Sequence, residues 1–198
     1  MRFVLASASP ARLATLRAAG LDPEVIVSGI DEDGYDAPTP HELAQVLASA
    51  KLRAVLPQVS RDGLVLACDS VLEFNGKPYG KPGNADVAVE RWRMMRGKSG
   101  ILHTGHTMLG PKELTVATVS TVVYFADATD AEIEAYAASG EPTTVAGGFT
   151  IDGFGGWFVE RIDGDHHNVV GVSLPAVRAM VRAQGFELTD LGYPATPS

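Results

Sequence analysis

Two hydroxyls and a guanidinium lie close together near the start of the chain, at Ser7, Ser9 and Arg12. An apolar run precedes them, Ser9 suits a helix N-cap, and Pro10 suits the first helical position, which predicts a short strand that leads into a helix. The free backbone N–H groups of the helix start, the hydroxyls and the cation could together bind an anion such as phosphate. The alternative is an ordinary capped helix whose Arg12 side chain points into water.

Carboxylates follow two of the expected strands. Asp69 comes directly after the continuous apolar run 64–68, which is typical of a central strand covered on both faces. Open α/β sheets gather their ligands at such strand ends, so we expect Asp69 in a functional site rather than in a simple turn. The cluster Asp31-Glu32-Asp33 follows a strand expected over 24–28. It is either solvated surface or a site for a hard cation, which prefers carboxylate oxygens.

Two lysines are candidates for binding an anion. Thr39 and Glu42 form a capping box that opens a helix, which we expect to end near Leu56. Lys51 lies at the edge of the expected core stripe of this helix, where it could contact a phosphate or extend its amine into water. The stripe consists of Leu43, Val46, Leu47, Ala50 and Ala54. Lys81 lies in a loop rich in glycine and proline that could present it to a ligand.

Glycines and histidines offer weaker signals. The stretch 146–156 is the most glycine-dense part of the chain, which suits either close backbone approach to a flat ligand or a mobile loop. His103 and His106 are three residues apart on an expected strand, so they point to opposite faces and do not easily share a metal. His166 and His167 could reach a cleft or lie exposed in a turn.

Expected strands and helices alternate along the chain, and these elements must position the residues named above. Asn75-Gly76 predicts a tight hairpin, and two long extended segments over 101–109 and 114–125 predict a second hairpin. Further helix starts stand at Asn84, Thr129 and Pro175.

Composition limits the partners. The 198 residues carry a formal net charge of −8 and one cysteine, Cys68, with a pI near 5.0. The acidic balance argues against nucleic acid or an anionic membrane as the main partner, so any phosphate site must be local. One cysteine excludes an internal disulfide framework. With no basic leader and no apolar run that could span a bilayer, we expect a soluble, cytoplasmic protein folded as one unit over 1–198, with a loose tail over 191–198.

The order of several short segments resembles the Maf family of nucleotide pyrophosphatases over nearly the whole chain. The segments are Leu5-Ala6-Ser7-x-Ser9-Pro10-x-Arg12, the strand before Asp69, Gly80-Lys81-Pro82, Gly140-Glu141-Pro142, Ala146-Gly147-Gly148-Phe149, Ile162-Asp163-Gly164 and Val169-Val170-Gly171-Val172-x-Leu174-Pro175. This resemblance implies an α/β fold with an elongated mixed sheet flanked by helices. It also implies two lobes around a deep cleft, similar to the inosine triphosphate pyrophosphatases.

The resemblance further implies a reaction, the hydrolysis of a nucleoside triphosphate to the monophosphate and pyrophosphate with Mg²⁺ or Mn²⁺. It implies removal of non-standard nucleotides, a link to cell-division arrest, and a homodimer. Asp69 matches the family's proton acceptor, and Glu32 matches an acidic position near the metal, which Asp69 would also contact. Ser7, Ser9, Arg12, Lys51 and Lys81 match phosphate-facing positions. The residue chemistry agrees, because cleavage between the α and β phosphates requires cations, a carboxylate to activate water and a divalent ion.

Three positions depart from the branches of this family whose base preference is recognisable. The branch that acts on thymidine and uridine triphosphates has arginine, threonine and glutamine where this chain has Ala11, Ser70 and Asp152. The branch that acts on 7-methylguanosine triphosphate has an aromatic residue at the Ala11 position and glutamine at the Ser70 position. The base preference therefore stays open.

Two other functions compete with this interpretation. One is a non-catalytic, nucleotide-binding regulator of septum formation, which would have no need of the carboxylates Glu32 and Asp69. The other is a phosphatase that releases single phosphates, although the sequence shows no phosphoenzyme nucleophile. Analysis of the products separates the phosphatase from the pyrophosphatase.

Overall fold

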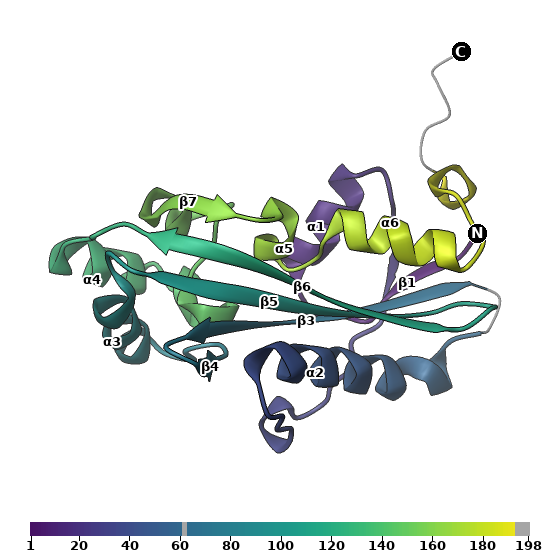
Figure 1. Ribbon diagram of the computed structural model, residues 1–198, viewed down its shortest axis with the longest axis horizontal. Helices are drawn as coiled ribbons and strands as arrows, with labels where there is room; N and C mark the ends of the chain where they lie inside the picture. The colour runs from purple at the N-terminus through teal and green to yellow at the C-terminus, as the bar shows by residue number, and fades with distance from the viewer. Residues whose placement is uncertain (61–62, 193–198) are drawn as a thin grey trace, which may run out of the picture.

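A long, mixed β-sheet forms the frame of the molecule (Figure 1). The computed structural model describes residues 1–60 and 63–192. Six of its seven strands follow the order β2-β1-β3-β5-β6-β7, and the seventh, β4, pairs with β3 beside this path. The strands are β1 (Phe3–Leu5), β2 (Glu24–Val25), β3 (Leu64–Phe74), β4 (Lys77–Tyr79), β5 (Ser99–Leu109), β6 (Leu114–Phe125) and β7 (Val159–Asp163). β1 is parallel to both β2 and β3, whereas the other pairs are antiparallel.

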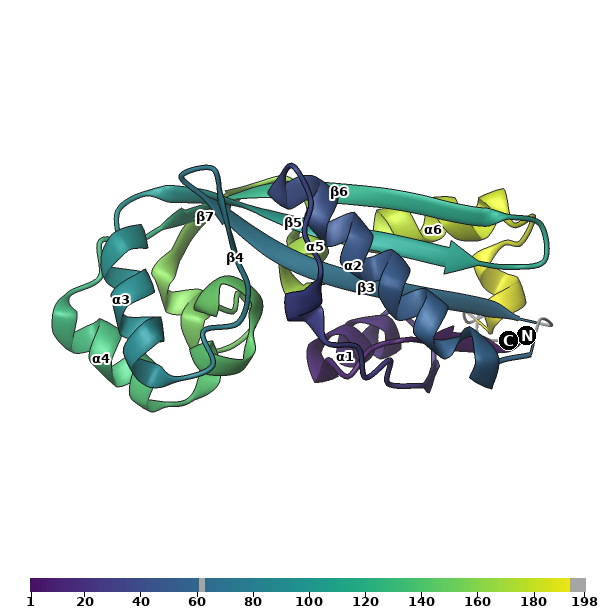
Figure 2. The same cartoon turned by 90° about the horizontal axis from the view of Figure 1, so that it is seen from below.

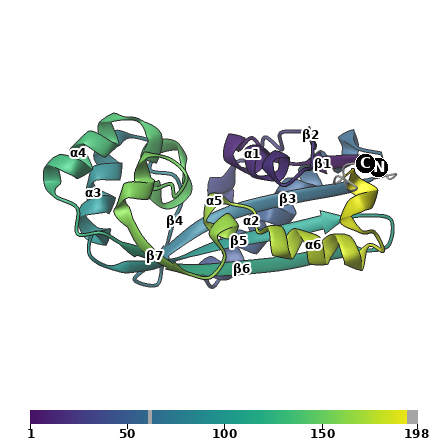
Figure 3. The same cartoon turned by 90° about the horizontal axis from the view of Figure 1, so that it is seen from above.

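Helices cover both faces of this sheet, as Figures 1 and 3 show. The helices are α1 (Pro10–Ala18), α2 (Pro40–Val55), α3 (Ala85–Met95), α4 (Asp130–Ala138), α5 (His166–Val170) and α6 (Leu174–Ala183). α2 lies along one face, and α1, α5 and α6 lie on the other. Among the described residues, no helix is long and apolar enough to cross a membrane.

The hydrophobic core is divided between the two faces and one end of the sheet. Leu5, Leu16 and Val181 belong to the cluster under α1 and α6, and Val4 and Leu52 belong to the cluster under α2. A third cluster, centred on the fully buried Trp92, joins α3 and α4 to the far end of the sheet. Figure 2 shows this end as a group of elements set apart from α1 and α2, in agreement with the expected two lobes.

Local sequence signals account for most element boundaries. Ser9, Thr39, Asn84 and Thr129 each accept a hydrogen bond at the start of their helices, as the sequence predicts. The expected Asn75-Gly76 turn joins β3 and β4 with both residues at positive φ. The short helix α5 was not expected; its N-cap is Asp165.

Two local expectations were wrong in part. The strand expected over 24–28 is limited to β2. In α2, Leu47 and Ala50 of the expected stripe are buried as predicted, whereas Leu43, Val46 and Ala54 are only half-buried. Ala44, Ala48, Leu52 and Val55 are buried in addition, because the helix packs with a different rotation on the sheet. Of the tail expected to be loose, 193–198 lies outside the described residues.

Candidate active site

The cleft lies along a bare edge of β3. On that edge β3 pairs with β1 through Leu64–Leu66 and with β4 through Leu72–Phe74. Within the described ranges, the intervening residues 67–71 have a strand partner only in β5. A cleft of about 1050 Å³ opens there, and its walls include all ten residues predicted from the sequence. These are Ser7, Ser9, Ala11, Arg12, Glu32, Lys51, Asp69, Ser70, Lys81 and Asp152.

Asp69 lies within β3 and not at its end. The expectation of a strand end was wrong because the chain continues in the same strand to Phe74, with Asp69 opposite Gly105 of β5. A Cβ at Gly105 would lie 2.3 Å from the Ala44 carbonyl oxygen of α2. The missing side chain therefore lets α2 approach the sheet closely, on the face to which Asp69 points.

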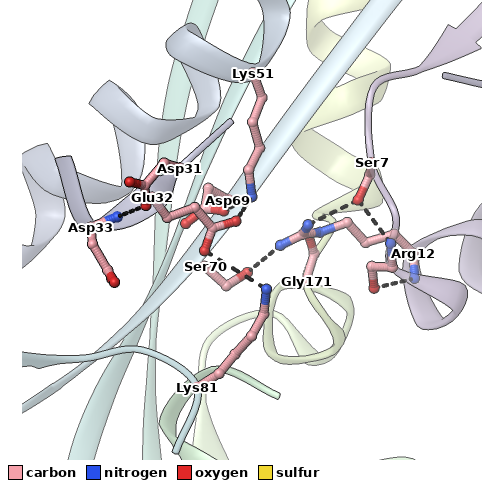
Figure 4. A network of polar contacts seen from close by, with 11 residues as sticks. Ser7, Arg12, Asp31, Glu32, Asp33, Lys51, Asp69, Ser70, Lys81 and Gly171 are labelled. Atoms are coloured by element: carbon pink, nitrogen blue, oxygen red, sulfur yellow. Dashed lines mark hydrogen bonds and ion pairs between the residues drawn. The ribbon is translucent and has the colours of Figure 1, made fainter. Parts of the chain in front are cut away.

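This close packing brings Lys51 of α2 onto Asp69. The Lys51 ammonium donates a hydrogen bond to the Asp69 carboxylate, and it also lies 2.6 Å from Glu32 Oε1 (Figure 4). Lys51 is 7% exposed and Asp69 is 5% exposed. The two carboxylates thus converge on one buried cation, although they come from segments far apart in the sequence.

The two carboxylates differ in pKa. Burial raises the pKa of Asp69, and the charges of Lys51 and Arg12 offset this effect only in part. Glu32 is less buried; desolvation raises its pKa, but the hydrogen bond and charge of Lys51 outweigh it, so its pKa is lowered. Asp69 is therefore the stronger base of the pair, and Glu32 remains ionised over a wider pH range.

Arg12 joins three parts of the fold. Its Nε donates to the Gly171 carbonyl at 2.7 Å, Nη1 to Ser7 Oγ at 3.1 Å and Nη2 to Ser70 Oγ at 3.0 Å. Gly171 has φ +116°, and a Cβ there would lie 3.1 Å from Arg12 Nε. The alternative of an arginine pointing into water is wrong, because Arg12 is 8% exposed and forms these contacts within the fold.

Lys81 is the more accessible lysine of the cleft. Its ammonium lies 3.7 Å from Glu32 Oε2, with 56% of the side chain exposed. Arg91 of α3 also lines the cleft, donates to the Gly80 carbonyl at 2.5 Å and lies over the Tyr79 ring. The sequence reasoning missed Arg91; its spacing of three residues from the buried Ala88 could have placed it at the edge of the core stripe.

Ala11, Ser70 and Asp152, the three positions that depart from the known branches of the family, have different surroundings. Ser70 points to the opposite face of β3 from Asp69, because neighbouring residues of a strand alternate. Its hydroxyl lies 2.9 Å from Thr104 Oγ1 and accepts from Arg12, so it is part of the contacts that hold the guanidinium. Ala11 and Asp152 line the cleft, and Asp152 is exposed.

The histidines serve other parts of the fold. His103 lies 2.8 Å from Ser120 Oγ and 2.9 Å from Glu73 Oε2, whereas His106 accepts from the Ser173 backbone N–H at 2.8 Å. The two side chains thus have separate partners. Burial lowers the pKa of His106 to about 4, so this side chain is neutral in its place near α6. His166 and His167 are not among the residues that line the cleft.

Comparison with known proteins identifies the family. The sequence model described as "Maf-like protein" matches residues 2–184. The chain belongs to the Maf family. Maf relatives named "Nucleoside triphosphate pyrophosphatase" include proteins of Streptomyces avermitilis, at 55% identity, and Streptomyces coelicolor, at 52% identity. The first alignment covers 98% of this chain and 95% of the relative, and the second covers 98% and 96%.

A solved structure is also similar to this Maf chain. The Ham1 protein of Staphylococcus aureus aligns with 93% of this chain and with 100% of its own length, at 16% identity and a TM-score of 0.49.

The donors of the Maf site suit a shared metal rather than a complete protein cage. Among the described residues, no group of three or more His, Cys, Asp and Glu side chains could hold a metal ion. Glu32 and Asp69, however, both direct oxygens at the Lys51 ammonium. Mg²⁺ is commonly held by one or two carboxylates together with substrate phosphates and water, so these two residues fit such an ion.

Proposed function

We propose that this chain hydrolyses nucleoside triphosphates to nucleoside monophosphates and pyrophosphate. The observation that carries the proposal is the buried Asp69 carboxylate, held by Lys51 at the edge of a cleft that also collects Arg12 and Lys81. The name shared by the most similar curated relatives supports the same reaction.

Asp69 is the general base of the proposed reaction. It accepts a proton from water while the water oxygen attacks one of the two phosphorus atoms joined by the α–β bridging oxygen. The P–O bond on that side breaks, and the bridging oxygen leaves with the other product. Burial supports this role, because a raised pKa brings the basicity of Asp69 closer to what proton transfer near neutral pH requires.

The cations bind and orient the triphosphate. Lys81 is exposed enough to reach a phosphate directly, and Lys51 would exchange part of its contact with the carboxylates for phosphate oxygens. The guanidinium of Arg12 faces the cleft beside Ser7 and Ser9, where the start of α1 adds backbone N–H groups. These groups offset the charge that develops on the phosphate oxygens.

The charge balance favours a divalent ion as the cofactor. The described cleft wall carries four cations, Arg12, Lys51, Lys81 and Arg91, and four carboxylates, Glu32, Asp33, Asp69 and Asp152, so the site itself offsets little of the charge of a triphosphate. Glu32 and Asp69 would hold Mg²⁺ or Mn²⁺. When bound, the ion supplies further charge neutralisation for the phosphates and makes water easier to deprotonate.

The proposal places the enzyme in the cytoplasm, where it would remove non-standard nucleotides before they are used. Ala11, Ser70 and Asp152 are the proposed determinants of base preference. The homodimer and the link to cell-division arrest stay predictions from the resemblance.

Product analysis tests the proposal. The purified chain is incubated with normal and modified nucleoside triphosphates and Mg²⁺ or Mn²⁺, and the products are separated. Monophosphate and pyrophosphate in equal amounts, lost when the metal is chelated, support the proposal. Diphosphate with single phosphate would favour a phosphatase, and binding without turnover would favour the non-catalytic regulator of septum formation.

A further inference from the structure

The wall of the cleft that carries Asp152 has no regular secondary structure. Residues 149–153 join two 3-10 turns, Ala146–Gly148 and Phe154–Phe158. Thr150 and Asp152 both line the cleft. Because no helix or strand hydrogen bonds order this stretch, other contacts must fix where its side chains lie.

One carboxylate supplies these contacts. Glu141 Oε1 accepts hydrogen bonds from Tyr136 Oη at 2.9 Å, from the Gly155 N–H at 2.9 Å and from the Thr150 hydroxyl. Glu141 Oε2 accepts one from the Phe154 N–H at 2.9 Å. An ionised carboxylate has about four lone-pair positions, and three of these four donors crowd on Oε1, which leaves that oxygen no room for another.

The backbone wraps tightly around this carboxylate. A Cβ at Gly153 would lie 2.4 Å from Glu141 Oε2, and a Cβ at Gly155 would lie 2.5 Å from Tyr136 Oη. Side chains at these two positions would therefore push the carboxylate and its partners apart. The glycines of this segment are explained by the approach of the backbone to Glu141, and the segment 150–155 is here named the Glu141 turn.

Glu141 itself is not among the residues that line the cleft. Any effect on the bound nucleotide must therefore act through the Glu141 turn. The phosphate-binding side chains are also separate from it, since in the part of the chain that the structure describes Arg12, Lys51 and Lys81 have other partners than Glu141.

We propose that Glu141 is a positioning residue for base recognition, which holds the Glu141 turn so that Asp152 faces the base of the bound nucleotide. The inference rests on the proposed function, because it assigns this wall to the base of a nucleotide substrate. It separates two parts of the site: the cations and Asp69 act on the triphosphate, whereas Glu141 determines the selectivity between bases.

The test compares Glu141→Gln with the unaltered protein on two nucleoside triphosphates, the best substrate and the next best. The amide keeps the size of the side chain but turns one acceptor into a donor, which faces an N–H or hydroxyl donor. We expect the ratio of kcat/KM between the two bases to fall about tenfold, mainly through KM, since a hydrogen bond to a charged group is lost. Inhibition by inorganic tripolyphosphate, which has no base, should change less than about twofold, on the scale of ordinary surface substitutions.

Two further variants are measured in the same assay, one as a control and one as a weaker change at the same carboxylate. Glu132→Gln makes the same chemical change in the same lobe, at a carboxylate that accepts hydrogen bonds from Thr129 at the start of α4, and should leave the base ratio unchanged. Tyr136→Phe removes one of the four donors to Glu141 and should lower the ratio less than Glu141→Gln does. If Glu141→Gln does not fold, the base ratio of Tyr136→Phe is compared with that of the unaltered protein, and this comparison decides for or against the inference.

An unchanged base ratio in the folded variants would overturn the inference. A parallel loss of tripolyphosphate inhibition would overturn it too, because the effect would then reach the phosphate side of the cleft. The proposed function fails in a different way, when the unaltered chain hydrolyses no nucleotide. The base ratio is then taken from dissociation constants measured by calorimetry, with the same expected change.

Discussion

The ammonium of Lys51 and the carboxylate of Asp69 form an ion pair beneath the close contact of α2 with β5. Both residues are more than nine-tenths buried, and Glu32 shares the same ammonium from the more exposed side. A buried ion pair is strongly sensitive to the loss of one partner, since the remaining charge is then left in a medium that solvates it poorly. The base and the phosphate-binding lysine of the proposed reaction therefore depend on each other.

Removing the lysine from this pair should destabilise the fold. We expect Lys51→Met to lower the free energy of unfolding by about 3 to 5 kcal/mol where Asp69 is ionised, and by less at acidic pH. Urea unfolding measures this change, with the exposed Lys77→Met as the control. The double variant Lys51→Met/Asp69→Asn should regain much of the loss, because no buried charge is then left unpaired. Additive losses would contradict the coupling.

The raised pKa of Asp69 has opposite consequences for activity and stability. A base must be ionised, so kcat/KM should rise with pH through the folded pKa of Asp69, above the ordinary range of an aspartate. Ionisation of this buried group costs stability, so its favourable contribution is present below the unfolded pKa and is lost as pH rises through the folded pKa. Asp69→Asn should therefore gain stability relative to the unaltered protein as pH increases. Rate profiles and urea midpoints over the same pH series measure both trends, and an acid limb at the ordinary aspartate value would contradict the assignment.

Arg12 should not be replaceable by lysine. The planar guanidinium donates to Gly171, Ser7 and Ser70 at once, a geometry that a single ammonium does not reproduce. We expect Arg12→Lys to lower kcat/KM at least tenfold and the free energy of unfolding by roughly 1 to 3 kcal/mol. Arg17→Lys is the matched control, since Arg17 lies on the same helix in an exposed pair with Asp22. Equal effects of the two substitutions would show that the three Arg12 contacts add nothing to kcat/KM or to the free energy of unfolding beyond what an exposed arginine adds.

The contribution of Glu141 to stability should depend on pH with the sign opposite to that of Asp69. Desolvation raises its pKa, but the hydrogen bonds from Thr150, Gly155 and Phe154 outweigh this, so the folded pKa is lowered. The ionised form then stabilises the folded protein above the unfolded pKa, and this contribution is lost as pH falls through the folded pKa. The difference in unfolding free energy between the unaltered protein and Glu141→Gln should be largest near neutral pH and should shrink on acidification. A difference that does not vary with pH would argue against this carboxylate as the cause.

The sequence predicted which residues form the site better than it predicted the contacts between them. The N-cap serine and the following proline predicted that Ser9 and Arg12 lie at the start of a helix. In the structure they lie at the start of α1. Asp69 was expected at a strand end because the apolar run stops there, yet Val71 and Leu72 restore burial on both faces and the strand continues. A single charged residue within a strand does not end it when its partner strand, here β5, continues alongside.

Long-range contacts account for what the sequence could not show. The contact of Arg12 with Gly171 depends on where α5 packs, and the contact of Lys51 with Asp69 depends on the small residue Gly105 in another strand. Neither follows from the spacing of residues along one element. Glu141 was recognised only as part of a motif, because its four donors come from α4 and from the turn beyond Phe149.

The role of Asp69 is tested by comparing Asp69→Asn with the unaltered protein, by turnover and by binding of the same nucleoside triphosphate. We expect monophosphate and pyrophosphate from the unaltered protein. In Asp69→Asn we expect a rate lower by about 100-fold or more, because a general base is lost. Nucleotide affinity should be largely retained, because Arg12, Lys51 and Lys81 remain. Turnover by Asp69→Asn close to that of the unaltered protein would show that Asp69 is not the general base.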